Sequence, residues 1–304
     1  MSTGTDIPAS ASFTAHGAPQ RCSPKMLQGC ADLAHKHNLP VYTHVYETRG
    51  QRLIATEQFA DYDGSLITYL ERNNLLGPKL NIVHSVWIKR QEMDRIAAAD
   101  AGIVLNHLSN LKLKSGIAPV LDIREAGVRI GLGCDNCSGS DVQNIFQAMK
   151  TFCLFAAVSD PEPGAPLAHE VLRHATLGNA RTAGLQGKLG AIKPGHMADL
   201  ILIDLNDTAY LPYNSAARQL VYTETGRGID SVMIGGRMVL QAGKITTIDE
   251  DALRREVEDL MRHFVKDYDA VVKSRARALP FMLDAHRKMW EPDVGVNRFV
   301  SRTR

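Results

Sequence analysis

Between residues 39 and 157, four short apolar segments alternate with amphipathic segments that have the spacing of helices. This order is typical of βαβ units, in which helices connect and cover parallel strands. No Gly-x-Gly-x-x-Gly turn follows any of the apolar segments, which argues against a dinucleotide-binding sheet. The sequence therefore predicts an α/β fold of the (β/α) barrel type.

The predicted strands cover residues 39–46, 79–88, 102–108 and 128–135. The predicted helices cover residues 24–36, 65–74, 90–101, 118–127, 141–157 and 167–185. The first of these helices has a clear start, because Ser23 is a good N-cap and Pro24 suits the first turn. Residues 1–187 are assigned to this α/β part of the chain.

The pattern changes after residue 187. Residues 188–247 contain short β-type runs separated by glycine, proline and aspartate, so we predict a small β-sandwich module there. Residues 248–304 form a third region, with helical periodicity that should break at Pro280 and then restart.

Composition narrows the class of protein. The chain is 44% hydrophobic and 22% charged with a formal net charge of +2, which is ordinary for a globular protein and calls for neither nucleic acid nor a membrane surface. The first twenty residues lack the pattern of a secretory signal, and no apolar run approaches the ~20 residues of a membrane span. The odd number of cysteines, five, fits a reducing compartment, so we expect a cytoplasmic protein.

Polar side chains gather at the same end of all four predicted strands. The first strand ends with His44 and Glu47, the second carries His84, the third runs into residues 106–116, and the fourth ends at Asp135. A single buried histidine is usually a hydrogen-bonded core residue. Here polar residues stand at the carboxyl ends of all four predicted strands, and barrel enzymes place their active sites at these ends. The shared position therefore points to a functional site.

His44 and Glu47 can meet only under one condition. Alternation along a strand sends His44 and Tyr46 to one face and Glu47 to the other. The two side chains converge if the strand stops near Tyr46 and Glu47 turns back from a loop, and we interpret residues 48–52 as that loop. Imidazole and carboxylate groups are standard zinc ligands, and an unliganded glutamate can move protons.

Two other motifs are given structural interpretations. Cys134 and Cys137 form a CxxC, but a structural zinc site needs four ligands and the sequence has no second CxxC or HxxxH. A redox role for the pair is disfavoured by Asp135 between them, which opposes the thiolate. His35 and His37 lie at the end of a predicted helix, and we interpret them as solvated residues near its dipole.

The stretches "HVYET", "VHSVW", "NHLSNLKLKSGIAPV", "GLGCDN" and "HATLGNARTAGLQGKLGAIKPGHMADLILID" closely resemble the cytosine deaminase-like and chlorohydrolase-like branch of the amidohydrolase superfamily. The resemblance extends from "FTAHGAPQRCSPKML" to "GGRMVL". It implies that residues 1–187 are the C-terminal half of a (β/α)8 TIM-type barrel, an incomplete barrel, followed by the β module and the C-terminal helices.

The resemblance also implies roles for four residues. His44 corresponds to a metal ligand and Glu47 to a proton shuttle. His84 corresponds to a histidine that polarises or orients the substrate and the attacking water. Asp135 corresponds to an aspartate that approaches the metal and accepts a proton from its water, so it counts both as a ligand and as a catalytic group.

The implied reaction is hydrolysis of a C–N bond that is not a peptide bond. It would be the deamination or dechlorination of an aminated heterocycle, with one divalent metal ion that lowers the pKa of water towards ~7. Zinc is the first choice for this ion and iron the second. Ser109 and Asn110 match a segment that lies near the site in the family. The resemblance implies that these two residues contact the substrate or order a loop. The expected partners are a small heterocyclic substrate and further copies of the chain.

One feature of the family has no counterpart here. Its members take two further metal ligands from a His-x-His on the first barrel strand, and the alignment places residue 1 near the fourth strand. A half barrel would leave open strand edges, and we expect weak metal affinity for this chain alone. Three interpretations stay open: a sequence truncated at its N-terminus, a fragment that docks with a partner supplying the first half, or a degenerate non-catalytic paralogue. A rival from another class is a non-enzymatic interaction module that pairs with another chain through the open half barrel.

Overall fold

The computed structural model describes residues 13–14, 17–160, 164 and 168–300. Five parallel strands form one sheet in sequential order. These are β1 (Phe13–Thr14), β2 (Val41–Val45), β3 (Leu80–His84), β4 (Gly102–Leu105) and β5 (Arg129–Leu132). The prediction of an α/β fold with a parallel sheet is confirmed, and four of the strands lie inside the predicted segments.

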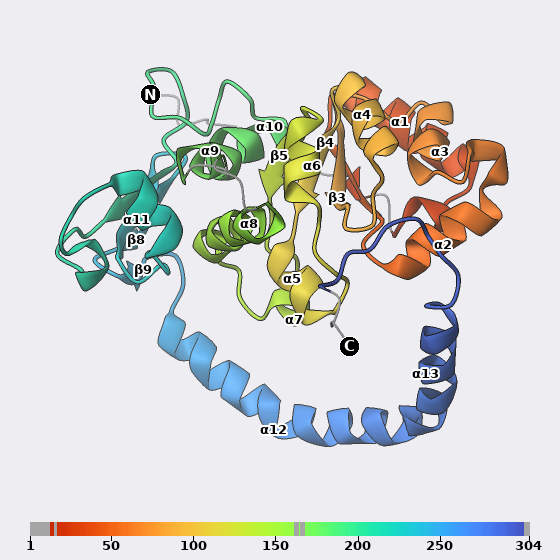
Figure 1. Ribbon diagram of the computed structural model, residues 1–304. Coiled ribbons are helices and arrows are strands. Elements are labelled where there is room, and N and C mark those ends of the chain that lie inside the picture. Colours follow the sequence, from red (N-terminus) through yellow and green to blue (C-terminus); the bar gives the residue numbers. More distant parts are fainter. Residues whose placement is uncertain (1–12, 15–16, 161–163, 165–167, 301–304) are drawn as a thin grey trace.

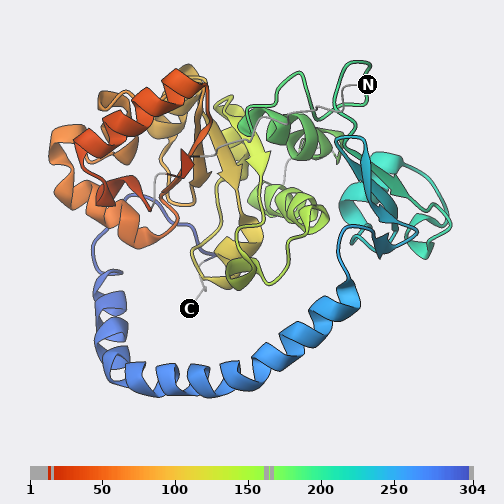
Figure 2. The same ribbon diagram turned by 180° about the vertical axis from the view of Figure 1, so that it is seen from behind.

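Helices connect the strands and cover one face of this sheet, as α4 and α6 do in front of the strands in Figure 1. The helices of this part are α1 (Pro24–His37), α2 (Arg49–Gln58), α3 (Leu66–Arg72), α4 (Arg90–Ala98), α5 (His107–Lys112), α6 (Val120–Glu125), α7 (Cys137–Ser140), α8 (Ile145–Ser159), α9 (Ala168–Arg173) and α10 (Asn179–Thr182). Alternation in β2 matches this layering, because Val41, Thr43 and Val45 are buried while Tyr42 and His44 are only half-buried. Figure 2 shows the molecule from behind.

Helix α1 begins where the sequence predicts. The Ser23 hydroxyl accepts a hydrogen bond from the Met26 amide at 3.3 Å, and Pro24 occupies the first turn. The helix ends at Asn38, which adopts the left-handed conformation that closes many helices.

The interpretation of residues 48–52 as a loop is wrong. Thr48 is the N-cap of α2 and accepts a hydrogen bond from the Gln51 amide, so the chain turns directly into a helix. The sequence does not indicate this helix start, because the glycine at position 50 is a poor helix former. Helices α5 and α7 and strand β1 were also not predicted, since elements of two to six residues are too short to show a period.

The second sheet lies in the predicted β module. Strands β6 (Leu200–Ile203), β7 (Ile229–Ile234), β8 (Arg237–Gln241) and β9 (Lys244–Ile245) pair antiparallel in that order. The expectation of a sandwich is not met, because the residues that the structure describes form one sheet here rather than two. An unpredicted helix, α11 (Ala216–Tyr222), interrupts the module and packs against α8 and α9.

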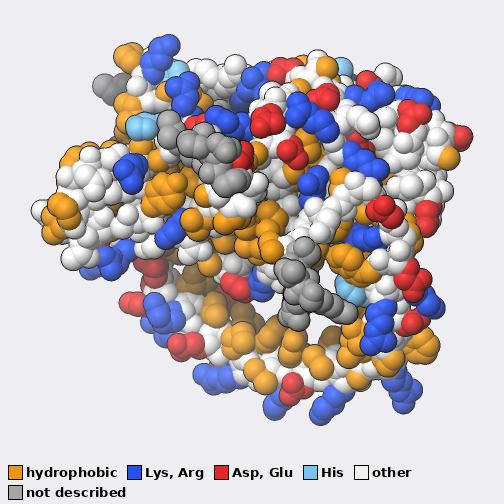
Figure 3. Space-filling model, viewed as in Figure 1, with side chains coloured by type: hydrophobic (Ala, Val, Ile, Leu, Met, Phe, Trp, Pro, Cys, Tyr) orange, Lys and Arg blue, Asp and Glu red, His pale blue; other side chains and the backbone are white. Residues whose placement is uncertain are grey.

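The third region is an exposed arm of two helices, α12 (Glu250–Arg275) and α13 (Leu279–Lys288), joined by a 3₁₀ turn at Ala276–Ala278. The predicted break at Pro280 therefore falls slightly late, and the proline stands in the first turn of α13. Figure 1 shows the arm arching away from the body, and Figure 3 shows hydrophobic side chains along its inner side. None of the helices in the described ranges is long and apolar enough to cross a membrane.

The chain returns from the arm to the body through residues 289–300, here called the C-terminal strap. Val294 of the strap is buried in the hydrophobic core, with 3% of its surface exposed. These residues belong to the region predicted as a helical tail, but α13 ends at Lys288 and the structure has turns and bends without a helix over residues 289–300. The helix prediction is therefore wrong for the strap.

Candidate metal and catalytic site

Three ionisable side chains converge at the carboxyl ends of the parallel strands. Glu47 follows β2, His84 ends β3 and Asp135 follows β5, and one ligand atom from each lies within 4.8 Å of those of the other two. Nε2 of His84 is 3.9 Å from Oε2 of Glu47. His84 is almost fully buried, whereas Glu47 keeps about a fifth of its side chain exposed. The cluster thus has one side open to solvent.

Unusual backbone conformations produce this convergence. Strand β2 stops at Val45, and Tyr46 adopts a left-handed conformation with φ of 55°. This turn brings the Glu47 carboxylate to the same site as His84 instead of the opposite face of the sheet. His84 and Asp135 are also left-handed, with φ of 74° and 62°. Such conformations cost about 1–3 kcal/mol each in residues other than glycine, and they gather at functional sites.

The hydrogen bond of His84 to Asn110 fixes the roles of its two ring nitrogens. Nδ1 lies 2.8 Å from the Asn110 side-chain oxygen, which can only accept, so Nδ1 carries a proton. Burial lowers the pKa of His84, although Glu47 and Asn110 oppose this effect. A neutral ring leaves Nε2 with a free lone pair, and this atom faces Glu47.

The Asp135 carboxylate is held by donors from two sides. The Ser109 hydroxyl donates to one oxygen at 2.5 Å, and the Asn136 amide donates to the other at 2.7 Å. Burial alone would raise the pKa of Asp135, but these hydrogen bonds and the nearby His84 and His44 together lower it. The carboxylate is therefore ionised near neutral pH and can bind a cation.

The remaining predicted residues lie beside this cluster. The ring of His44 is 5.1 Å from that of His84, centroid to centroid, but His44 does not belong to the group of three ligand atoms. Ser109 and Asn110 are buried, and the contacts described above orient Asp135 and His84. The assignments of His44 as a metal ligand and of Ser109 and Asn110 as substrate contacts stay predictions.

The donor set fits a divalent transition metal ion. Zinc in catalytic sites takes three nitrogen or oxygen ligands and keeps one position for water or substrate. Here a neutral imidazole nitrogen and two carboxylates are gathered within 4.8 Å, and a second imidazole lies beside them. Asn110 fixes the ring of His84 through its other nitrogen, which is how metal-binding histidines are usually oriented.

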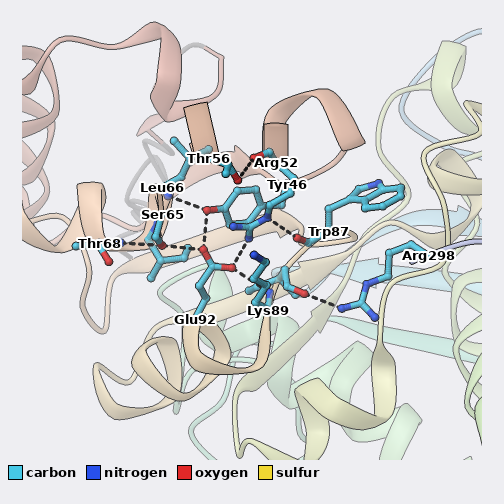
Figure 4. A network of polar contacts seen from close by, with 12 residues as sticks. Tyr46, Arg52, Thr56, Ser65, Leu66, Thr68, Trp87, Lys89, Glu92 and Arg298 are labelled. Carbon is cyan, nitrogen blue, oxygen red and sulfur yellow. Dashed lines mark hydrogen bonds and ion pairs between the residues drawn. The ribbon is translucent and has the colours of Figure 1, made fainter. Parts of the chain in front are cut away.

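A buried polar network supports the turn that carries Glu47 (Figure 4). The Tyr46 hydroxyl donates to Glu92 at 2.6 Å and accepts from the Leu66 amide at 2.7 Å. Glu92 also accepts from Ser65 at 2.7 Å and forms a buried ion pair with Arg52. The Arg52 guanidinium stacks 3.5 Å above the Tyr46 ring. The network therefore fixes the residue that directly precedes Glu47.

Sequence reasoning did not identify this network or Gln143, whose side chain donates to the backbone oxygen of Asp135 at 2.5 Å. A weak signal exists for Glu92, which stands at the third position of α4 and caps the Lys89 amide as in a capping box. Cys134 and Cys137, considered above for other roles, are both free thiols.

A model of the amidohydrolase family matches residues 5–239, which is well over half of the chain. The chain therefore belongs to the amidohydrolase family, and the resemblance seen in the sequence is confirmed. It is 31% identical over 246 residues to a 5-methylthioadenosine/S-adenosylhomocysteine deaminase of Halothermothrix orenii, covering 81% of this chain and 56% of that protein. It is 32% identical over 233 residues to a 5'-deoxyadenosine deaminase of Methanothermobacter thermautotrophicus, covering 77% of this chain and 53% of that protein.

Solved structures agree with this assignment. An adenosine deaminase from Xanthomonas campestris with bound zinc superposes with a TM-score of 0.76 at 27% identity, covering 83% of this chain and 57% of that one. The fold is also that of an atrazine chlorohydrolase from Arthrobacter aurescens complexed with zinc, with a TM-score of 0.71 at 22% identity, covering 78% of this chain and 52% of that one. The chain spans about half the length of the curated relatives it matches.

Proposed function

We propose that this chain carries catalytic groups of a metal-dependent hydrolase that cleaves C–N bonds other than peptide bonds. The reaction is the hydrolytic deamination of an aminated heterocycle, with dechlorination as the related chemistry. The observation that carries this proposal is the convergence of Glu47, His84 and Asp135, with one ligand atom from each within 4.8 Å of the others. The names of the relatives favour a 6-aminopurine nucleoside as the substrate.

One divalent ion, zinc before iron, would be held by Asp135 together with His44 or His84. Such an ion supplies Lewis-acid chemistry, which makes water nucleophilic near neutral pH. Side chains of the protein transfer the protons. Glu47, which is partly exposed, would take one proton from the attacking water and deliver it to the ring nitrogen, while His84 orients the substrate. Asp135 would accept the second proton of that water, and this proton would pass through Glu47 to the leaving amine, so that ammonia departs and both carboxylates return to their starting state.

Residues 1–187 form the second half of a (β/α)8 barrel, and the five parallel strands belong to this half. Residues 188–247 form the β module and residues 248–304 the C-terminal tail, which is helical in the arm as far as Lys288. The support is the consecutive parallel order of β1–β5 and the coverage of about half of each solved relative. We also propose a homo-oligomer, since the five-stranded sheet of the described residues is open, with β1 and β5 at its edges. We further propose a cytoplasmic location, since the five cysteines suit a reducing compartment.

A second candidate is an interaction module without catalysis. It is favoured by the arm, where α12 is a helix of 26 residues without a single buried side chain. Its exposed hydrophobic residues are Leu253, Val257, Leu260, Met261, Phe264, Val265, Tyr268, Val271 and Val272. Apolar residues at this spacing form a stripe that normally packs against another element.

Ammonia release separates the two candidates. The zinc-loaded chain should release ammonia from 5'-deoxyadenosine, 5'-methylthioadenosine or adenosine, since hydrolysis exchanges the exocyclic amine for a carbonyl oxygen and consumes one water. Cytosine and atrazine serve as alternative substrates in the same assay, with chloride as the product measured for atrazine. Hydrolysis of none of these compounds above the protein-free blank would contradict the enzyme proposal and favour the interaction module.

A further inference from the structure

The C-terminal strap lies across the loops that carry the candidate site, although more than 150 residues separate it from every site residue. Its first contact is with the start of α2, just after Glu47. The Arg49 guanidinium donates to the backbone oxygens of Met289 and Pro292, and it lies 4.9 Å from the centroid of the Trp290 ring. Arg49 is buried, so this contact excludes solvent.

The second contact is with the loop that follows His84 at the end of β3. Trp87 is almost fully buried, and its ring centroid lies 6.0 Å from that of Trp290 and 6.1 Å from that of Phe299. The Arg298 guanidinium donates to the backbone oxygen of Ile88 at 2.6 Å (Figure 4). An aromatic cluster and a charged hydrogen bond thus dock the strap on this loop.

The third contact is with the segment that follows Asn110. The Ile117 amide donates to the backbone oxygen of Arg298 at 2.8 Å. Gly116, with φ of 115°, lies so close to the strap that a β-carbon there would come within 2.9 Å of the same oxygen. The Ser115 amide donates to the backbone oxygen of Asn110 at 2.8 Å, so this loop is directly connected to the residue that orients His84.

We propose that the strap holds these three segments, the start of α2 and the two loops, in the geometry of the site, and that Trp290 and Arg298 are positioning residues for the hydrolysis. This role rests on the proposed function, because it concerns the placement of Glu47, His84 and Asn110. The strap is connected to the body along the chain only through the exposed arm, so its docking depends on the three contacts described above. Groups that orient metal ligands from outside typically change metal affinity or activity by about 10–100-fold when removed.

The test compares Arg298→Ala with Arg277→Ala, which removes an exposed arginine from the arm. Hydrogen exchange followed by mass spectrometry should show at least tenfold faster exchange at residues 46–50, 85–89 and 111–117 in Arg298→Ala, and unchanged exchange in the β module. Zinc affinity, measured by competition with a chromogenic chelator, should fall about tenfold in Arg298→Ala. Arg298→Lys, which keeps one donor for the Ile88 oxygen, should recover part of both effects.

The two proposals fail in different ways. If hydrogen exchange in the three segments is equally fast in Arg298→Ala and Arg277→Ala, the strap does not hold these segments, whatever the zinc affinity. Faster exchange with unchanged zinc affinity would overturn the positioning role and leave the proposed function standing. Absence of zinc binding in the unmodified chain would contradict the proposed function and with it the positioning role, whereas the exchange rates would still decide whether the strap holds the three segments.

Discussion

Replacing Glu47 with glutamine is expected to lower ammonia release from the preferred nucleoside by about 10²–10⁴-fold, which is the usual contribution of a general acid–base group. Glutamine has nearly the same shape, so it keeps the position beside His84. It cannot carry a proton to the ring nitrogen or to the leaving amine. The measurement is the initial rate of ammonia production at saturating substrate, with zinc in excess.

The matched control is Glu57→Gln, which makes the same change at an exposed position of α2. Its rate should stay within about twofold of the unmodified chain, because surface substitutions away from special contacts have small effects. Zinc content should also be compared, since Glu47 lies close enough to the other ligand atoms to contact a bound ion. A rate for Glu47→Gln equal to that of Glu57→Gln would contradict the shuttle role.

The largest expected effect on stability is that of Glu92→Gln. The substitution leaves the Arg52 guanidinium buried without its partner, and only 2% of the Arg52 side chain is exposed. Breaking a buried ion pair on one side costs about 3–5 kcal/mol in the free energy of unfolding. The amide nitrogen of the glutamine is a donor, so it would also oppose either the Tyr46 and Ser65 hydroxyls or the Lys89 amide, according to which carboxylate oxygen it replaces. Urea unfolding followed by circular dichroism gives the value.

Glu71→Gln is the matched control, because Glu71 forms an ion pair with Arg95 in which both side chains are about half exposed. Its cost should be below about 1 kcal/mol, as for other surface pairs. Equal costs for the two variants would show that the Tyr46–Arg52–Glu92 network does not stabilise the turn at Tyr46. The Glu92→Gln protein should in addition lose part of its activity even where it is fully folded, since Tyr46 precedes Glu47.

The sequence was informative where a regular period exists. Strands such as β4 (Gly102–Leu105) are apolar throughout, because they are buried on both faces, and helices such as α4 show a clear amphipathic period. Short elements and the arrangement of the arm left no such signal. The break in the tail illustrates this, because a proline is tolerated in the first turn of a helix and so did not mark the end of α12.

The candidate site was only partly accessible from the sequence. Polar residues at strand ends could be recognised one by one, and the need for Glu47 to turn back followed from strand alternation. The means of that turn, a left-handed Tyr46 held by Glu92 and Arg52, depends on contacts between distant segments. The docking of the strap was even less predictable, since no local pattern in residues 289–300 indicates that Arg298 reaches Ile88.

The most direct test of the central claim is the zinc content of the purified chain, measured by mass spectrometry after equilibration with zinc and removal of the free ion. The same measurement on a His44→Ala, Asp135→Ala double variant provides the comparison. We expect up to one zinc ion per chain, bound weakly enough to be lost on extended dialysis, and none in the double variant. Equal zinc content in both proteins, or none in either, would contradict a metal-dependent site at the ends of these strands.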